Sequence, residues 1–127
     1  MLQVKTSYTP LGSKLETERA ELKIGGNEGE FFPYDLLLGS LSSCFYYTLY
    51  DVLTKSKNEV PSMEIIVTGD KRTEAPTTLE WTHMDITVFD EVDQKRFLRA
   101  VELAAKYCSI HATISKVAKM THEVHFQ

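Results

Sequence analysis

The chain has 127 residues and a mass of 14.5 kDa, the size of one ordinary domain. Hydrophobic residues make up 43% of it and charged residues 25%, so it can form a hydrophobic core. The formal net charge of -4 and the pI of about 5.5 argue against a basic face for binding phosphates, and we expect no nucleic-acid partner.

The longest apolar run without a charged residue covers residues 36–50. It is shorter than the roughly 20 residues that cross a membrane, so we expect a buried core helix and no membrane partner. Residues 1–6 lack the basic and apolar segments of a secretory signal. We therefore expect a cytoplasmic protein. In that compartment a pair of cysteines, here Cys44 and Cys108, is more often catalytic or redox-sensing than a permanent disulfide.

The N-terminal part of the chain predicts two strands, over residues 2–8 and 15–24, separated by turn residues at 9–13. Apolar and charged residues alternate in the second strand, which ends at the consecutive glycines Gly25 and Gly26. These two strands lead through a short polar segment to the longest predicted element.

A helix is predicted over residues 33–56. Pro33 suits the first turn because its missing N–H is not needed there, and Asp35 places a carboxylate near the positive end of the helix dipole. The helix is apolar on nearly every side, so it must be covered on every side. Since one small sheet covers only one face, we expect a second helix or a partner chain against the rest.

The C-terminal half predicts strands over residues 62–71 and 78–89, then a helix capped by Asp90. A short helical piece over residues 110–117 precedes a final strand. The capped helix carries one apolar stripe, formed by Phe97, Leu98, Val101, Ala104, Ala105 and Cys108. The predicted order is β-β-α-β-β-α-β, and we expect a single α+β domain over residues 1–127.

Two segments of the chain resemble one known family. Residues 33–44, PYDLLLGSLSSC, are similar to the Pro-x-acid-Leu-Leu…Cys helix start of the OsmC/Ohr family, and residues 107–116 resemble its second cysteine segment. Spacing and strand order agree over essentially the whole chain. The resemblance implies an OsmC-like fold whose long central helix is buried in an intertwined homodimer. It also implies a thiol peroxidase acting on organic hydroperoxides, or a relative whose substrate is not established.

In that reading Cys44 is the attacking thiol and Cys108 the resolving thiol. The thiolate breaks the O–O bond and becomes a sulfenic acid, which the second thiol converts to a disulfide. An external dithiol then resets the pair by exchange, without a metal or organic cofactor. The apolar side chains of Leu37, Leu41 and Tyr47 are the expected pocket for an apolar hydroperoxide.

Two charged residues are candidates for supporting the thiolate. Family peroxidases use an arginine, since an unassisted cysteine has a pKa of about 8.5. Arg19 is the only arginine before Cys44, but it lies on the polar face of its predicted strand, where a surface role competes with an activating one. Asp35 lies about 2.5 helical turns from Cys44, so the two side chains point to opposite sides of a straight helix.

His111 follows Cys108 by one helical turn. This Cys-x-x-His spacing can begin a zinc site, whose further ligands would come from Cys44, His122 or His125. The alternative is a polar histidine close to the thiols, which would lower a thiol pKa when protonated.

Three hypotheses follow for the function of the chain. The first is the organic hydroperoxide peroxidase. The second is a non-catalytic OsmC-like protein that binds a small apolar or thiol-bearing ligand at the dimer interface, in which both cysteines pack as small hydrophobic residues. The third is a zinc-binding structural protein.

Overall fold

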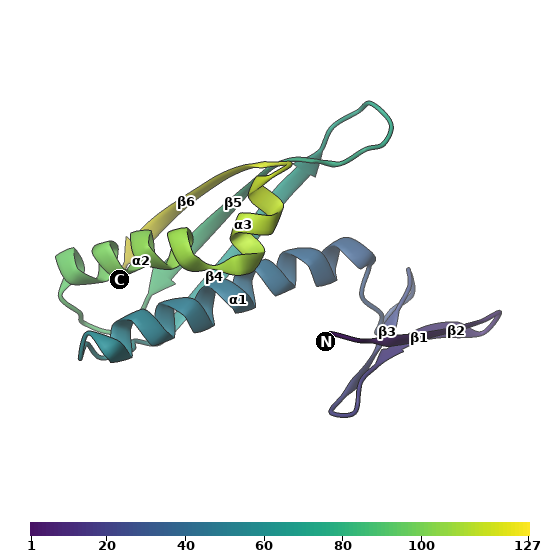
Figure 1. The fold of residues 1–127 in the computed structure, drawn as a ribbon, viewed down its shortest axis with the longest axis horizontal. Coiled ribbons are helices and arrows are strands. Elements are labelled where there is room, and N and C mark those ends of the chain that lie inside the picture. The colour runs from purple at the N-terminus through teal and green to yellow at the C-terminus, as the bar shows by residue number, and fades with distance from the viewer. The chain divides into compact units, whose positions relative to one another are not determined.

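The computed structural model describes residues 1–127, which divide into two compact units, residues 1–37 and 38–127. The elements are β1 (Lys5–Thr9), β2 (Gly12–Glu16), β3 (Glu21–Ile24), α1 (Pro33–Lys55), β4 (Met63–Lys71), β5 (Leu79–Val88), α2 (Gln94–Tyr107), α3 (Ser109–Ser115) and β6 (Lys119–Phe126) (Figure 1). This mixed composition confirms the predicted α+β class. The single domain over the whole chain stays a prediction.

The smaller unit contains an antiparallel sheet with the strand order β1-β2-β3. The prediction of one strand over residues 15–24 is therefore wrong, because a turn at residues 17–20 divides it into β2 and β3. The Thr17 hydroxyl accepts hydrogen bonds from the N–H groups of Arg19 (3.1 Å) and Ala20 (3.3 Å), which stabilises a tight turn. The alternation of side chains continues on both sides of the turn, so periodicity alone does not reveal it.

The start of α1 at Pro33 agrees with the predicted helix, which ends one residue beyond the observed Lys55. The Asp35 carboxylate accepts a hydrogen bond of 2.8 Å from the Phe32 N–H, just before the helix. This is the third-position half of a capping box, which satisfies a donor that would otherwise lack a partner at the helix start. Asp35 thus has a local structural role in addition to its charge.

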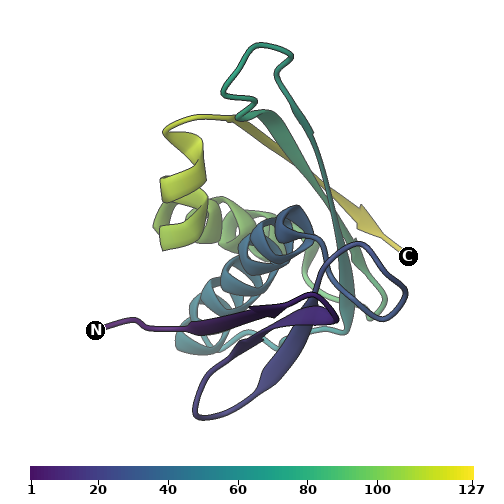
Figure 2. The same cartoon turned by 90° about the vertical axis from the view of Figure 1, so that its right-hand side faces the viewer.

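The larger unit contains a second sheet, with the order β4-β5-β6. β4 is antiparallel to the central strand β5, whereas β6 runs parallel to β5. The helices α1, α2 and α3 lie on one face of this sheet (Figure 2). The core between the helices and the sheet includes Leu41, Phe45, Leu49 and Leu53 from α1, Met84, Ile86 and Val88 from β5, and Phe97, Ala100, Val101 and Ala104 from α2.

The start of α2 corrects two details of the sequence prediction. Asp93, not Asp90, caps the helix, and its side chain accepts a hydrogen bond of 3.1 Å from the Arg96 N–H. The Asp90 carboxylate instead accepts one of 2.7 Å from the Ser62 N–H, at the start of the neighbouring strand. Leu98, predicted in the apolar stripe, is exposed, because the buried face of α2 runs through Phe97 and not its neighbour.

Cys108 lies between α2 and α3, as the C-cap of the first helix and the N-cap of the second. Its N–H donates to the Ala104 carbonyl oxygen at 2.8 Å, and its sulfur accepts a hydrogen bond from the His111 N–H at 3.4 Å. The predicted order β-β-α-β-β-α-β therefore agrees in outline, with one strand more than expected, and α3 is the short helical piece predicted over residues 110–117. The side chain of Cys108 is fully buried, as its place in the stripe predicts.

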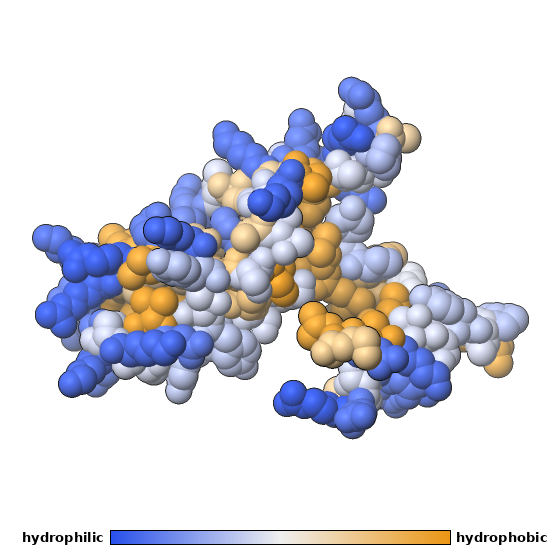
Figure 3. All heavy atoms as spheres, in the orientation of Figure 1, coloured by the Kyte–Doolittle hydropathy of each residue, from blue (hydrophilic) through white to orange (hydrophobic).

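One side of α1 remains uncovered within the larger unit. Leu41, Phe45, Leu49 and Leu53 form its buried face, whereas Tyr47 and Tyr50 keep 64% and 43% of their surface exposed. Hydrophobic residues also reach the surface among hydrophilic ones in the region that α1 and α2 occupy (Figure 3). The partner chain that would cover this side stays a prediction. No helix of the structure has both the length and the apolar character needed to cross a membrane.

Candidate functional site

The two cysteines, far apart in the sequence, meet within the larger unit. Cys44 lies on α1 and is half-buried, while Cys108 lies fully buried at the junction of α2 and α3. Both are free thiols, and the side chain of Cys108 hydrogen-bonds with that of Cys44. The Ser109 hydroxyl oxygen lies 3.9 Å from the Cys44 sulfur. The site is thus a pair of reduced thiols beside the first turn of a short helix.

The surroundings of Cys44 favour its thiolate form. Burial is the largest single effect on this group and opposes ionisation, but the hydrogen bonds to the sulfur together outweigh it and lower the pKa of Cys44. The donors are, from the largest effect to the smallest, the backbone N–H of Ile110, the thiol of Cys108, the hydroxyl of Ser109 and the hydroxyl of Thr48. Hydrogen bonds to the sulfur stabilise the negative charge that develops on it, and a lowered pKa makes a cysteine a better nucleophile near neutral pH.

Cys108 has the opposite tendency. Burial raises the pKa of the Cys108 thiol, and the hydrogen bond to Cys44 and the negative charge of that sulfur raise it further. The His111 N–H, which donates to the Cys108 sulfur, opposes this rise but does not cancel it. Of the two thiols, Cys44 therefore loses its proton first, and Cys108 then donates a hydrogen bond to the Cys44 thiolate.

Backbone geometry supplies part of the site, and sequence reasoning missed that part. Ser109 and Ile110 act through a hydroxyl and a main-chain N–H, and neither residue type signals a role in a sequence. The available signal was the position of Ser109 directly after the second cysteine, at the start of a predicted helical piece. The Thr48 hydroxyl also lies close: it donates to the Cys44 carbonyl oxygen at 2.8 Å and makes a small contribution to the lowered pKa of Cys44.

The predicted substrate-pocket residues occupy different environments. Leu41, one turn before Cys44, is fully buried in the core. Tyr47, one turn after Cys44, is exposed and contacts Tyr46 edge-on, with 5.2 Å between the ring centroids. Leu37 belongs to the smaller unit. A pocket formed by all three side chains stays a prediction.

The two charged residues expected near the thiol, Arg19 and Asp35, both belong to the smaller unit. Arg19 is exposed within the turn that joins β2 to β3. The Asp35 carboxylate caps α1 through the Phe32 N–H. The pKa of Cys44 is lowered by hydrogen-bond donors from the α2–α3 junction and from Thr48 of α1, so activation of this thiol has a physical basis that needs neither residue.

His111 approaches the site through its backbone. Burial lowers the pKa of the imidazole, and the charge of His122 lowers it further, so the ring is neutral at neutral pH. It therefore brings no positive charge to the Cys44 thiolate. The other histidines proposed as zinc ligands have separate partners: His122 pairs with Glu102 at 3.0 Å and His125 with Asp85 at 3.1 Å. They point to opposite faces of β6, so the two cannot join one site with Cys108.

Comparison with known proteins identifies what this arrangement resembles. The sequence profile of the family described as OsmC-like protein matches residues 25–123. The Escherichia coli protein YhfA is 28% identical over 108 residues, which cover 80% of this chain and 79% of YhfA. An OsmC-like protein from Mycoplasma pneumoniae has the same fold, with a TM-score of 0.87 and 14% identity over 98% of this chain and 95% of that one. An organic hydroperoxide resistance protein from Elizabethkingia anophelis aligns with a TM-score of 0.74 and 14% identity, over 100% and 98% of the two chains.

Proposed function

Because the chain belongs to the OsmC-like protein family, we propose that it is a thiol peroxidase that reduces organic hydroperoxides, with Cys44 as the nucleophile and Cys108 as the resolving thiol. The observation that carries the proposal is the opposite behaviour of two adjacent thiols. The pKa of Cys44 is lowered and that of Cys108 is raised, so the half-buried sulfur is the one that ionises. The name of the Elizabethkingia relative supports hydroperoxides as the substrate class.

The reaction divides into three balanced steps. The Cys44 thiolate attacks the outer oxygen of the hydroperoxide, the O–O bond breaks, and the alkoxide takes a proton and leaves as an alcohol. The Cys44 sulfenic acid then condenses with the Cys108 thiol to give a disulfide and water. An external dithiol reduces this disulfide by exchange and returns both thiols. The sequence of steps requires no metal and no organic cofactor.

The burial of Cys108 suits the second role. A fully buried thiol with a raised pKa reacts slowly with peroxide in solution, because the thiolate is the nucleophile. Its hydrogen bond to Cys44 nevertheless places it beside the sulfur that becomes oxidised. The reducing cytoplasm, with its thiol reductants, is the compartment that this cycle needs. The proposal also includes a homodimer, in which a partner covers the exposed tyrosines of α1.

Peroxide consumption with a dithiol present tests the proposal directly. Reduced protein is supplied with dithiothreitol and cumene hydroperoxide, and the loss of hydroperoxide is followed over many turnovers. We expect turnover by the native protein, slower turnover of hydrogen peroxide, and none by Cys44→Ser. Equal rates in the native protein and Cys44→Ser would show that another group carries the reaction.

A second candidate function has its own support. The exposed turn that contains Arg19, and the absence of the family's arginine segment around it, favour a non-catalytic relative that binds a small apolar or thiol-bearing ligand at the dimer interface. The exposed rings of Tyr47 and Tyr50 would then contact the ligand. Titration of the thiols separates the two: a peroxidase keeps a large thiolate fraction near neutral pH, whereas the binding protein does not need it.

A further inference from the structure

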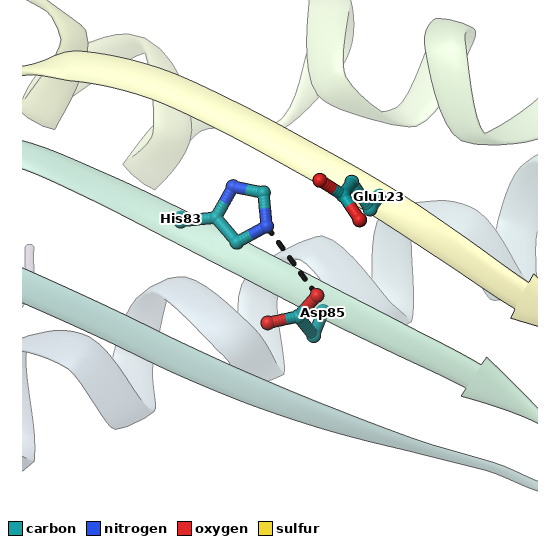
Figure 4. A group of neighbouring side chains, drawn as sticks. All are labelled: His83, Asp85 and Glu123. Carbon is teal, nitrogen blue, oxygen red and sulfur yellow. Dashed lines mark ion pairs between the residues drawn. The ribbon is translucent and has the colours of Figure 1, made fainter.

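A cluster of histidines and carboxylates lies on the outer face of the larger sheet, away from the helices and the thiol pair. Side chains of a strand alternate between its two faces. Because Met84 and Ile86 of β5 are buried in the core, His83 and Asp85 point outward. Glu123 and His125 of β6 point outward in the same way. Figure 4 shows His83, Asp85 and Glu123 gathered over the two strands.

The register of the parallel pair β5 and β6 places two negative charges side by side. Asp85 lies directly opposite Glu123; His83 is two residues before Asp85 on β5, and His125 is two residues after Glu123 on β6. Like charges directly opposite each other on neighbouring strands are destabilising. A divalent cation between the two carboxylates would turn that repulsion into attraction.

The distances within the cluster are close to those of a metal site. One ligand atom each from His83, Asp85 and Glu123 lie within 4.8 Å of one another. The His83 Nε2 is 3.3 Å from the Asp85 Oδ1. Ligand atoms on a tetrahedral zinc ion, at bonds of about 2.0–2.2 Å, are separated by roughly 3.3 Å. Small side-chain rotations, above all of the exposed Glu123, would bring the remaining atoms to that separation.

The orientation of the His83 ring leaves a lone pair free for a metal. Its Nδ1 lies 2.6 Å from the Thr121 hydroxyl oxygen, and that hydroxyl donates its hydrogen to the Thr82 carbonyl oxygen at 3.4 Å. When the proton of the neutral ring is on Nδ1, where this hydroxyl oxygen can accept it, Nε2 carries the lone pair. That lone pair faces the Asp85 carboxylate. A histidine ligand whose second nitrogen is held by a hydrogen bond is the usual arrangement in metal sites.

We propose that His83, Asp85 and Glu123 bind a divalent transition-metal ion of the zinc class. One nitrogen and two oxygen ligands, completed by water, suit zinc or cobalt better than calcium or magnesium, which take oxygen ligands. His125, whose Nε2 lies 3.1 Å from the Asp85 Oδ1, orients that carboxylate without binding the ion itself. The ion would join β6 to the central strand, on the face opposite the thiols.

This site is independent of the proposed peroxidase reaction, and it replaces the expectation, drawn from the sequence, that the chain has no metal. The sequence gives no motif for it, because His-x-Asp and Glu-x-His stand on strands far apart in the chain and only their register brings them together.

Metal titration of the purified, reduced, metal-free protein tests the proposal. Zinc is added in competition with a chromophoric chelator, and cobalt is added separately to record its absorption spectrum. We expect one equivalent of tight zinc binding and a cobalt spectrum without the near-ultraviolet band of a thiolate ligand. A thiolate band, or the absence of saturable binding, would overturn the proposal, since either places the metal elsewhere or nowhere.

Matched histidine variants locate the site. His83→Ala should lose the stoichiometric binding step, and His125→Gln should weaken it by about 10–100-fold as an orienting residue. His122→Ala is the control, because His122 lies on β6 but points to the opposite face and pairs with Glu102. Equal loss in His83→Ala and His122→Ala would contradict the assignment.

Thermal unfolding separates binding from a folding defect. The variants are first compared without metal by circular dichroism, to confirm that they are folded. Zinc should then raise the Tm of the native protein in a concentration-dependent way, since a ligand that binds only the folded state stabilises it. His122→Ala should respond similarly and His83→Ala should not. An equal rise in a folded His83→Ala protein would overturn the proposal.

Discussion

The thiol of Cys108 hydrogen-bonds to the sulfur of Cys44, and the two pKa values move in opposite directions. Neither direction comes from an acidic or basic residue, since the only charge involved is that of the Cys44 sulfur itself. Cys44 is stabilised as a thiolate by the Ile110 N–H, the Cys108 thiol and the Ser109 hydroxyl, all from the junction of α2 and α3, which outweigh the opposing effect of its burial. Burial keeps Cys108 protonated. Hydrogen bonding at this junction thus favours Cys44 as the nucleophile of the proposed peroxidase cycle, and burial favours Cys108 as the resolving thiol.

Removing either sulfur should stop the cycle at a different step. Cys44→Ser should show no peroxide consumption above background. Cys108→Ser should consume about one equivalent of cumene hydroperoxide and then stall, because the sulfenic acid has no neighbouring thiol to condense with. Mass spectrometry should find one or more added oxygens on Cys44 in that variant. Sustained turnover by Cys108→Ser without over-oxidation would show that Cys108 is not the resolving thiol.

The ionisation of Cys44 should depend on its hydrogen-bond donors. Its thiolate fraction rises with pH around a pKa below that of an ordinary cysteine, so alkylation by iodoacetamide should be faster at Cys44 than at Cys108 near neutral pH. Cys108→Ala removes one donor and should shift the alkylation profile of Cys44 to higher pH. Ser109→Ala should shift it in the same direction.

Ser115→Ala is the matched control for these donor variants. Its hydroxyl donates to the Ala112 carbonyl oxygen within α3, so the substitution changes the same helix without touching Cys44. Its alkylation profile should match that of the native protein. A profile that shifts equally in Ser109→Ala and Ser115→Ala would point to a general change in α3.

The exposed side of α1 predicts an oligomer. α1 is apolar on nearly every side, yet Tyr47 and Tyr50 are exposed to solvent in the single chain. Burial of such aromatic side chains against a partner is a strong driving force for association. Light scattering should find a dimer. Tyr50→Glu should shift it toward a monomer, whereas Val117→Glu, at another exposed apolar position, should not. A native protein that is monomeric at all concentrations would contradict this prediction.

The capping residue of α2 should contribute measurably to stability. Asp93→Ala removes the acceptor of the Arg96 N–H and should lower the free energy of unfolding by about 1 kcal/mol, as is typical for loss of an N-cap. Urea unfolding followed by circular dichroism measures the change. Glu91→Ala, at an exposed position before the cap, is the control and should change stability by less than about 0.5 kcal/mol.

The sequence predicted elements best where one pattern dominated. The uninterrupted apolar run after Pro33 specified α1, and alternation specified β4, β5 and β6. The turn at residues 17–20 was not predicted because it contains no glycine or proline, the residues that usually mark a turn; the Thr17 hydroxyl stabilises it instead. Asp90 and Asp93 could not be distinguished as caps, since the choice depends on the Ser62 N–H, which is distant in the sequence.

The candidate site was predictable only in part for a similar reason. Residue types and a family resemblance indicated Cys44 and Cys108, but no spacing rule showed that they would meet. The donors that set their pKa values include the main-chain N–H of Ile110, which any residue could supply. The outer cluster around Asp85 depends on the register of β5 with β6, and a single sequence does not contain that information.

The measurement that tests the thiol pair most directly is intact-mass and free-thiol analysis after stoichiometric cumene hydroperoxide is added to the reduced protein. Our prediction is a rapid loss of two hydrogens, no remaining free thiol, and a Cys44–Cys108 crosslink after digestion. An unchanged mass with two free thiols would contradict it: the cysteines would then be packing residues, and the ligand-binding function would take its place.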